Sequence, residues 1–591
     1  MRGAFLCLIV AAAAWSRAVL AAAPEVTIDP GGVPPEALKA IVGAVDAITR
    51  LAEDQDGGEL SRLRRRARDA TLSALETQGY FSPKVTLEVG EDPLGETWDI
   101  TIEPGKRTKV ADVALDFSGQ LATDGFKARA GALRDAWPLT QGMPFINESW
   151  ANAKADLLDK VSSKDFFLAR MTHSQATIDA DEAQARLDVT IDSGPRVRMG
   201  EVQVIGLKRV PRTLVDRYVR FEPGEPYDQE RLDEWQQALE DTSFFRGATV
   251  ALNSDPALRR TLPNGEVEMP VTVQVAEAPA RRVSASLGVD SDNGVRVEGL
   301  YRQNVVFGQP VWIETGAGVD KNRQRVFYDV HFAPTLDGYK DSVGLLFSHS
   351  DIEGVDNRRI GLGWNRSQSR KAAGDSRVEY ETRWGALVAH DRTRIEGADN
   401  YEVPTLVATW QWLRRDVNDK YDPREGNLVD FGLGAGVTLD KGEPFYRSSL
   451  RAQQWWKVGK RDVLTVRGEV GKVWSNTSRL PEDFGYRTGG ARTIRGYAYQ
   501  SIGLARGSAT VGAPALAVVS VEYMRYFSDM FGMSVFVDAG DAAESFGAMK
   551  WAVGYGIGGL VRTPAGPFEV SVAYGQRERQ LRVHFSMGIA F

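Results

Sequence analysis

The sequence predicts three tandem α+β modules followed by a sixteen-stranded transmembrane antiparallel β-barrel. Three observations predict this fold: a repeated helix-then-strand pattern before residue 281, a change of composition near Arg281, and an apolar/polar alternation of period two from there onward. Of the 59 glycines in the 591-residue chain, 39 lie within residues 281–591, as do nine of the 14 tryptophans. The chain therefore divides into a modular part and a strand-rich part.

Composition excludes two classes of protein. The formal net charge is -7 and the sequence pI is about 5.6, so no global positive field exists to attract nucleic acid. Mean hydropathy is -0.29, and beyond the first 23 residues no run approaches the roughly 18 apolar residues that a membrane-spanning helix needs. Strands of a barrel give only a weak hydropathy signal, so we expect any membrane crossing to be made by strands.

Residues 1–23 are typical of a secretory signal peptide. Arg2 provides a positive start, an apolar stretch follows, and Ala21–Ala23 offer small residues for cleavage. The alternative is a buried amino-terminal helix in a cytosolic protein. The single cysteine, Cys7, lies in this segment, so we expect an exported product without a disulfide. Its five histidines are scattered, and we predict no metal site and no cofactor.

The next part of the chain contains a repeated pattern. The segment Gly142–Phe145 precedes a helical pattern, and Gly224–Tyr227 does the same 82 residues later. A weaker copy ends near Gly79, and each copy leads into alternating strands. We therefore predict modules at residues 24–105, 106–195 and 196–280, an array with a repeated binding surface. Three unrelated small domains are the alternative.

Residues 281–591 alternate as barrel strands do. In the first strand Val283, Leu287 and neighbouring apolar residues face one way, while Gly288 and small or polar residues face the other. The last strand alternates similarly and ends at the aromatic Phe591. Sixteen such segments close a barrel that is apolar outside and polar inside. A soluble propeller or sandwich is the competing architecture.

The longest connection, about residues 475–515, follows the eleventh strand. The parity of the strand count places it on the side opposite the modules, and its glycines and positive charge favour a course into the lumen. Glu522 and Asp538 fall on the inward parity of the next two strands. Because a cation inside a lumen needs counter-charges, we expect these carboxylates to face a basic residue of the loop.

This loop resembles the sixth extracellular loop of the POTRA-barrel superfamily of outer-membrane assembly proteins, whose motif is G-G-x(4)-R-G-(F/Y). The matching residues are Gly489, Gly490, Arg495, Gly496 and Tyr497. Further similarity lies at residues 421–426, 520–523, 536–540 and 563–567. With three amino-terminal POTRA-like modules, the chain is more similar to the TamA branch of the superfamily than to the BamA branch, which has five.

The resemblance implies an outer-membrane protein that keeps its modules in the periplasm and inserts or exports β-rich polypeptides such as autotransporters. It implies a TamB-like inner-membrane-anchored partner, and it implies that Arg495 is held by acidic residues of the barrel wall, here Glu522 and Asp538. The resemblance implies neither an enzyme nor a cofactor. From the residues themselves we expect unfolded outer-membrane polypeptides and outer-membrane lipid as partners, and no nucleic acid.

The junction between the first and last strands is predicted to be the weakest part of the barrel. Gly288 lowers the strand propensity of the first strand. The residues assigned to this seam are Val283, Leu287, Gly288, Phe585, Gly588 and Phe591. We predict that the seam opens sideways to admit a substrate strand, without nucleotide hydrolysis. A dedicated two-partner-type exporter and a passive outer-membrane pore are the alternatives.

Overall fold

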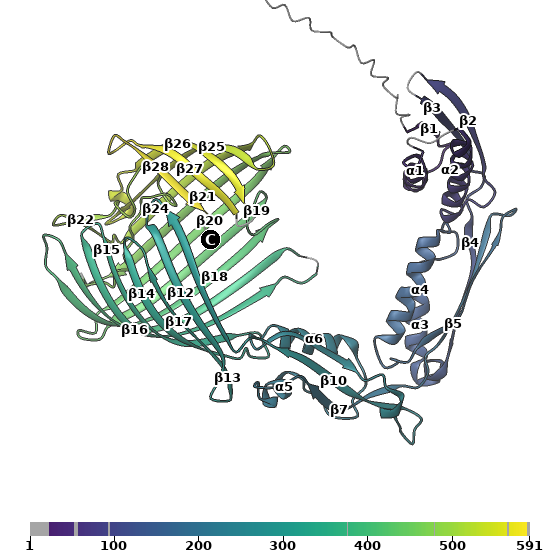
Figure 1. Ribbon diagram of the computed structural model, residues 1–591. Helices are drawn as coiled ribbons and strands as arrows, with labels where there is room; N and C mark the ends of the chain where they lie inside the picture. The colour runs from purple at the N-terminus through teal and green to yellow at the C-terminus, as the bar shows by residue number, and fades with distance from the viewer. Residues whose placement is uncertain are drawn as a thin grey trace, which may run out of the picture. The chain divides into compact units, whose positions relative to one another are not determined.

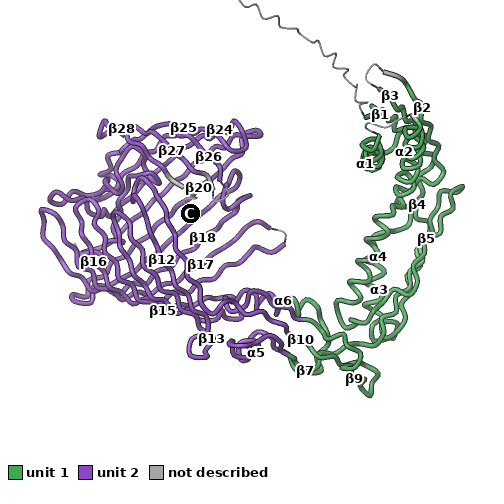
Figure 2. Tube along the Cα trace, viewed as in Figure 1, with its two compact units in different colours: residues 1–203, 221–233, 251–272 green, residues 204–220, 234–250, 273–591 purple. Residues whose placement is uncertain are grey.

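The computed structural model describes residues 23–52, 57–92, 95–374, 376–477, 479–563 and 566–587. Cys7 and nearly all of the predicted signal peptide lie outside these ranges. The chain forms two compact units, coloured separately in Figure 2. Unit 1 consists of residues 1–203, 221–233 and 251–272, and unit 2 of residues 204–220, 234–250 and 273–591. The third module therefore contributes to both units.

The first module packs two helices on one small sheet. Strands β1 (Glu25–Asp29), β2 (Lys84–Asp92) and β3 (Gly95–Glu103) pair in the order β1-β3-β2, and helices α1 (Pro35–Thr49) and α2 (Gly57–Thr77) lie against each other. The first turn of α1 carries Pro35, whose fixed φ suits the start of a helix. Ile41 and Val45 then follow on one buried face. The sequence pattern predicted α2 but not α1.

The second module has the same plan with shorter helices. Its sheet has the order β4-β6-β5, from β4 (Lys109–Ser118), β5 (Arg170–Asp179) and β6 (Gln184–Asp192). Helices α3 (Lys127–Asp135) and α4 (Asn147–Ser162) cover a core that includes Trp137, Trp150, Leu157 and Phe166. The 3-10 turns η1 (Gly119–Ala122) and η2 (Asp124–Phe126) connect β4 to α3. The side chains of β5, by contrast, are mostly exposed along the free edge of the sheet.

The third module follows without a linker. It comprises β7 (Val197–Ile205), α5 (Arg212–Tyr218), α6 (Gln229–Glu240), β8 (Phe245–Leu252), η3 (Pro256–Leu258), β9 (Arg260–Thr261) and β10 (Val267–Glu277). Its sheet order is β7-β10-β8, with β9 on β10. Two of its residues are bonded to the barrel within unit 2: the Tyr218 hydroxyl donates to the Pro334 carbonyl at 2.6 Å, and Asn304 Nδ2 donates to the Ser243 carbonyl at 3.2 Å.

Sixteen antiparallel strands form one continuous sheet in chain order, which confirms the predicted barrel (Figure 1). The strands are β11 (Arg281–Asp290), β12 (Gly294–Val306), β13 (Gln309–Val319), β14 (Arg323–Phe332), β15 (Lys340–Ile352), β16 (Val355–Lys371), β17 (Val378–Ile395), β18 (Tyr401–Val417), β19 (Gly426–Thr438), β20 (Pro444–Val458), β21 (Asp462–Ser475), β24 (Ala515–Tyr526), β25 (Phe531–Ala543), β26 (Ala552–Thr563), β27 (Gly566–Gly575) and β28 (Gln580–Met587). The short strands β22 (Leu504–Arg506) and β23 (Ala509–Val511) form a separate hairpin in the long loop, and η4 (Phe546–Ala548) lies between β25 and β26.

The register of the strands fixes which side chains face outward. On β11, Val283 and Leu287 are 77% and 78% exposed, as expected of a lipid-facing row. On β16 the outward parity places Ile360, Leu362 and Trp364 in succession, all of them exposed. Among the described residues, no helix is both long enough and apolar enough to cross a membrane.

Candidate functional site

The site is built around the loop between β21 and β24, residues 476–514, which we call the lumen loop. Its motif begins with Gly489 and Gly490, both at positive φ (107° and 109°), where a side chain would be strained. Within the motif, Gly489 N–H donates to Thr493 Oγ1 at 3.0 Å, and the Thr493 N–H donates to the Gly490 carbonyl at 3.2 Å. This tight turn directs the following residues at the inner wall.

Arg495 is the centre of the contact between the loop and the wall. Its Nε and Nη2 donate to the two carboxylate oxygens of Asp538, at 2.8 and 3.0 Å, and its backbone N–H donates to the same carboxylate at 3.0 Å. Its Nη1 donates to Glu522 at 3.0 Å and to Glu569 at 3.2 Å. The guanidinium carbon lies 3.3 Å from the centroid of the Phe536 ring. Arg495 is 5% exposed, so these contacts are shielded from water.

The two residues after Arg495 reach the last strands of the barrel. Gly496 N–H donates to His584 Nε2 at 2.9 Å, and a side chain at Gly496 would lie 2.7 Å from the backbone nitrogen of Gly575. The Tyr497 hydroxyl donates to the Val553 carbonyl and accepts the Arg577 N–H, both at 3.0 Å. Arg495, Gly496 and Tyr497 therefore lock the loop to β25 through β28, and glycine is required where the two backbones meet.

A second anchor fixes the earlier part of the loop to β15, β16 and β20. Arg359 donates to Asp391 on the neighbouring strand at 2.8 Å and to Asp483 of the loop at 2.7 Å. Ser350 Oγ donates to Glu482 at 2.6 Å, and the Tyr486 hydroxyl donates to the Ser448 carbonyl at 2.6 Å. The lumen loop thus crosses the interior and is held at both ends. Releasing it would break many of these hydrogen bonds and ion pairs together, at a large cost in free energy.

The seam between β11 and β28 differs from every other strand junction. The hydrogen-bonded sheet runs from β11 to β28, and in the described residues, which end at Met587, no ladder joins these two strands. Up to Met587, one backbone bond connects the two sides, from Ser291 N–H to the Phe585 carbonyl at 3.2 Å. Val283 and Leu287 lie on the exposed face of β11, beside Gly288. Gly588 and Phe591 lie outside the described residues.

The lumen loop also touches the first hairpin of the barrel. Both carboxylate oxygens of Asp292, in the turn between β11 and β12, accept the backbone N–H of Ala491, at 3.1 and 3.0 Å. A side chain at Gly490 would lie 2.8 Å from Asp292. Because Gly496 is bonded to His584 on β28, the loop motif contacts both sides of the seam within six residues.

Several of these residues were not predicted from the sequence. Glu569 and Arg467, whose Nη2 donates to the Thr493 carbonyl at 3.2 Å, lie on the inward parity of their strands. The reasoning that selected Glu522 and Asp538 applies to them equally. Asp391 likewise lies on the inward parity of β17. Asp292 and Asp483 carry no such signal, because they lie in a turn and in the loop and only the folded chain brings them to their partners. Groups of three or more His, Cys, Asp or Glu that could hold a metal ion are absent from the described residues.

Comparisons with known proteins agree with this geometry. A family model described as the Omp85 superfamily domain matches residues 283–591, one described as "POTRA domain TamA domain 1" matches residues 25–104, and a POTRA model described as "Surface antigen variable number repeat" matches residues 197–278. BamA from Haemophilus ducreyi lacking POTRA domains 1–3 has a similar fold: the TM-score is 0.67 at 15% identity, covering 82% of this chain and 100% of that one.

A relative from Treponema pallidum is described as a putative outer membrane protein assembly factor. It is 25% identical over 177 residues, which amount to 29% of this chain and 21% of the relative. The match therefore spans about a fifth of the relative's length.

Proposed function

Because the chain belongs to the Omp85 superfamily, we propose that it captures unfolded β-rich polypeptides in the periplasm and inserts or exports them through the barrel seam. The resemblance to the POTRA-barrel superfamily is confirmed, and with it the location: the barrel lies in the outer membrane and the amino-terminal modules lie in the periplasm. The proposal concerns the clients, the route and the partner.

The free edges of the module sheets support capture. Strand β5 lies at the end of its sheet, is bonded to β6 on one side, and carries mostly exposed side chains. Such an edge offers unpaired backbone N–H and C=O groups to an extended chain, with little demand on its sequence. Unfolded outer-membrane polypeptides, autotransporters among them, have this chemistry. A TamB-like inner-membrane-anchored protein is the proposed partner, supported by the TamA-type model at residues 25–104.

The observation that carries the proposal concerns the seam as far as Met587, where the described residues end: there β11 and β28 share no ladder, and one backbone hydrogen bond, from Ser291 to Phe585, joins them. A β-strand ladder normally offers such bonds along its whole length, so parting the described residues of this junction leaves few newly unpaired backbone groups. The lumen loop sets the position of both sides, through Asp292 on the first hairpin and His584 on the last strand. We infer that the seam opens while Arg495 keeps the loop fixed to Asp538, and that no nucleotide is hydrolysed.

A disulfide across the seam tests the route. The only cysteine of the sequence is Cys7, so Ser291→Cys with Phe585→Cys introduces one pair where a backbone bond of 3.2 Å already brings the strands together. Oxidation should stop assembly of an autotransporter by proteoliposomes, and reduction should restore it. The control pair is Val289→Cys with Val295→Cys, directly opposed on the β11–β12 hairpin. Full activity with the oxidised seam would reject the lateral route.

A further inference from the structure

The outward face of the barrel is not uniform along its height. On β16 the outward residues run from Arg358 near the extracellular end, through Ile360, Leu362 and Trp364, to Arg366 near the periplasmic end. The eight steps from Arg358 to Arg366 span about 26 Å along the strand, which at the usual tilt of about 40° is about 20 Å of height and covers most of the apolar band of an outer-membrane barrel. These two arginines therefore mark the two membrane interfaces.

The two interfaces carry different chemistry. Near the periplasmic end, Trp384 and Trp410 share the outward face with Trp364, as in the aromatic girdle of membrane barrels. Near the extracellular end the corresponding outward positions hold polar and cationic side chains instead, namely Gln324, His349, Arg358, His390, Arg392 and Arg394. We call this row the outer cationic row. It lies where the phosphate groups of the outer leaflet would be.

Two carboxylates order the outer cationic row. Asp356 accepts from His349 Nε2 at 2.8 Å and lies 3.7 Å from Arg358 Nε. Glu402 accepts from Arg392 Nε at 2.6 Å and lies 3.3 Å from His390 Nε2. Both arginines use their Nε for these contacts, so the row is held in place while terminal guanidinium groups remain exposed at its surface.

Arg394 adds a cation without a counterpart. Its side chain is exposed, and no carboxylate of the described residues forms an ion pair with it. Asp351 is also exposed at this rim, on the hairpin end of β15. With the histidines neutral, Asp351, Asp356 and Glu402 match the three arginines in formal charge. The carboxylates engage only the Nε side of Arg358 and Arg392, so the exposed guanidinium groups, which match phosphate oxygens in geometry, are what the row offers to a ligand.

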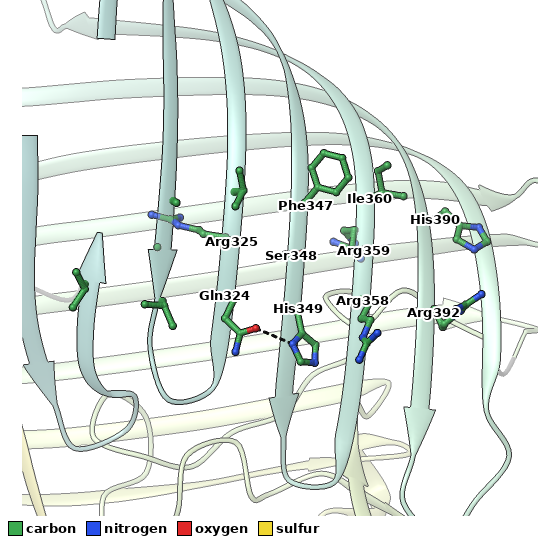
Figure 3. Close-up of a pocket in the computed structure, with 15 residues that line it drawn as sticks. Gln324, Arg325, Phe347, Ser348, His349, Arg358, Arg359, Ile360, His390 and Arg392 are labelled. Carbon is green, nitrogen blue, oxygen red and sulfur yellow. Dashed lines mark hydrogen bonds between the residues drawn. The ribbon is translucent and has the colours of Figure 1, made fainter. Parts of the chain in front are cut away.

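An apolar hollow of about 670 Å³ lies directly below the row. Its outward lining includes Val297, Val319, Val326, Phe347 and Ile360, and its polar border is formed by His349, Arg358, His390 and Arg392. Figure 3 shows the bordering side chains on neighbouring strands, with His349 bonded to Gln324. Volumes of this size hold small-molecule ligands in proteins. An apolar hollow can hold a hydrocarbon chain, and the guanidinium groups at its border can bind phosphate. The two together suit a lipid that has a phosphorylated head group.

We propose that this surface binds the phosphorylated glycolipid of the outer leaflet, with its phosphates on Arg358 and Arg392 and an acyl chain in the hollow. The position of the row at the extracellular interface selects an outer-leaflet lipid over phospholipids of the inner leaflet. The site lies on the outward face of the wall, and the lumen loop lies on the inward face, where Arg359, which also borders the hollow, holds Asp483. The site would fix one face of the barrel to ordered lipid while the seam remains free to move.

Native mass spectrometry of the full-length protein, released from detergent micelles, tests the site. The protein is titrated with bisphosphorylated lipid A, with dephosphorylated lipid A, and with phosphatidylglycerol. Arg358→Gln with Arg392→Gln should weaken lipid A binding by about 25-fold, since each basic residue near a membrane surface contributes about fivefold. The matched control is Arg366→Gln, the outward arginine at the other end of β16, which pairs with Asp341 at 2.8 Å.

Each outcome decides the proposal. Preference of the wild type for bisphosphorylated lipid A, lost in the double variant and kept in Arg366→Gln, supports it. Equal binding of dephosphorylated lipid A or of phosphatidylglycerol, or an equal loss in Arg366→Gln, would overturn it. Heat-modifiable gel mobility reports whether each barrel is folded. Should the double glutamine variant fail to fold, the double variant Arg358→Lys with Arg392→Lys replaces it. This variant keeps both positive charges, so it must still prefer bisphosphorylated lipid A. Loss of that preference in the lysine variant rejects the site.

Discussion

Asp292 and Ala491 are separated by 199 residues in the chain, yet both oxygens of the Asp292 carboxylate accept the Ala491 backbone N–H at 3.1 and 3.0 Å. The bond joins the first hairpin of the barrel to the lumen loop. Five residues further along the loop, Gly496 is bonded to His584 on the last strand. The loop therefore bridges a junction at which the described residues of the first and last strands share one backbone bond.

Removing the Asp292 carboxylate should release the tip of the loop. A hydrogen bond to a charged group contributes about 1.5–3 kcal/mol, so in Asp292→Ala the protection of residues 488–496 from hydrogen exchange should fall roughly 10- to 100-fold. Hydrogen exchange of the full-length protein in detergent, read by mass spectrometry, measures this. Asp399→Ala, on the exposed hairpin between β17 and β18, is the control. Unchanged protection in Asp292→Ala would show that Arg495 alone holds the tip.

Arg495 is expected to contribute more than any other side chain of the loop. Arg495→Ala leaves Asp538, which is 0% exposed, as an uncompensated buried charge, and breaking such a pair costs about 3–5 kcal/mol. Urea unfolding of the barrel in lipid vesicles should show a loss of this size, together with loss of client assembly. Arg495→Lys should recover only part of it, because an ammonium cannot make the two parallel bonds to Asp538.

Arg492 provides the control for that experiment. It lies three residues before Arg495 in the same loop, and its side chain is exposed. Arg492→Ala should change the free energy of unfolding by less than about 0.5 kcal/mol, as exposed substitutions usually do. A loss as large as that of Arg495→Ala would mean that the loop responds to its total charge and not to the contact with Asp538.

The strands were predictable because their chemistry is local. Period two fixes the face of every residue once one face is known, and this gave both the strand count and the inward positions of Glu522 and Asp538. The turn at Gly489 and Gly490 was recognisable for a similar reason, since consecutive glycines signal a backbone that other residues avoid.

The elements and contacts that were not predicted have only weak or non-local signals in the sequence. Helix α3 spans nine residues and buries only Ala130 and Leu133, so its periodicity is too short to recognise. The contact of Arg359 with Asp483 joins residues 124 positions apart, one of them in a loop without any period. Asp292 resembles an ordinary turn residue until the fold places Ala491 against it. Tertiary structure, and not local pattern, creates these contacts.

The joint between the second and third modules rests on Asp165. Its φ is 62°, its side chain accepts from Arg129 at 3.1 Å and from Arg196 at 2.6 Å, and its backbone bonds Tyr227 and Val197. Asp165→Ala should destabilise the modules by roughly 2–4 kcal/mol, less than for a fully buried pair because both arginines are partly exposed. The midpoint of the module transition, followed by calorimetry of the full-length protein, measures this.

Two further variants at this joint separate charge from backbone strain. Asp165→Gly relieves the positive φ but still lacks the carboxylate, so it should remain destabilised if the ion pairs matter. Asp181→Ala, at an exposed turn of the same module, is the control. Stability restored in Asp165→Gly would show that the alanine variant fails because of strain and that the ion pairs contribute little.

The third module should lose stability in acid through Glu266. The hydrogen bond from Arg198 is the main cause that lowers the pKa of Glu266; burial opposes it, and a bond from Asn264 at 2.9 Å adds to it. A carboxylate with a lowered pKa in the folded state stabilises the fold above the ordinary carboxyl range, near pH 4.3, and this stabilisation disappears as the pH falls through the lowered pKa. Calorimetry of the full-length protein between about pH 3 and pH 7 should therefore show the module transition falling most steeply below about pH 4.3.

Replacing the carboxylate should remove this pH dependence. Glu266→Gln cannot ionise, so its transition should lie lower at neutral pH, where the contact with Arg198 is weakened, and should fall less steeply in acid. Glu201→Gln, exposed on the same strand as Arg198, should follow the wild type at every pH. If the transition midpoint of Glu266→Gln fell in acid as steeply as that of the wild type, another carboxylate would be responsible for the acid sensitivity. The ion pair of Arg198 with Glu266 would then contribute to stability only at neutral pH.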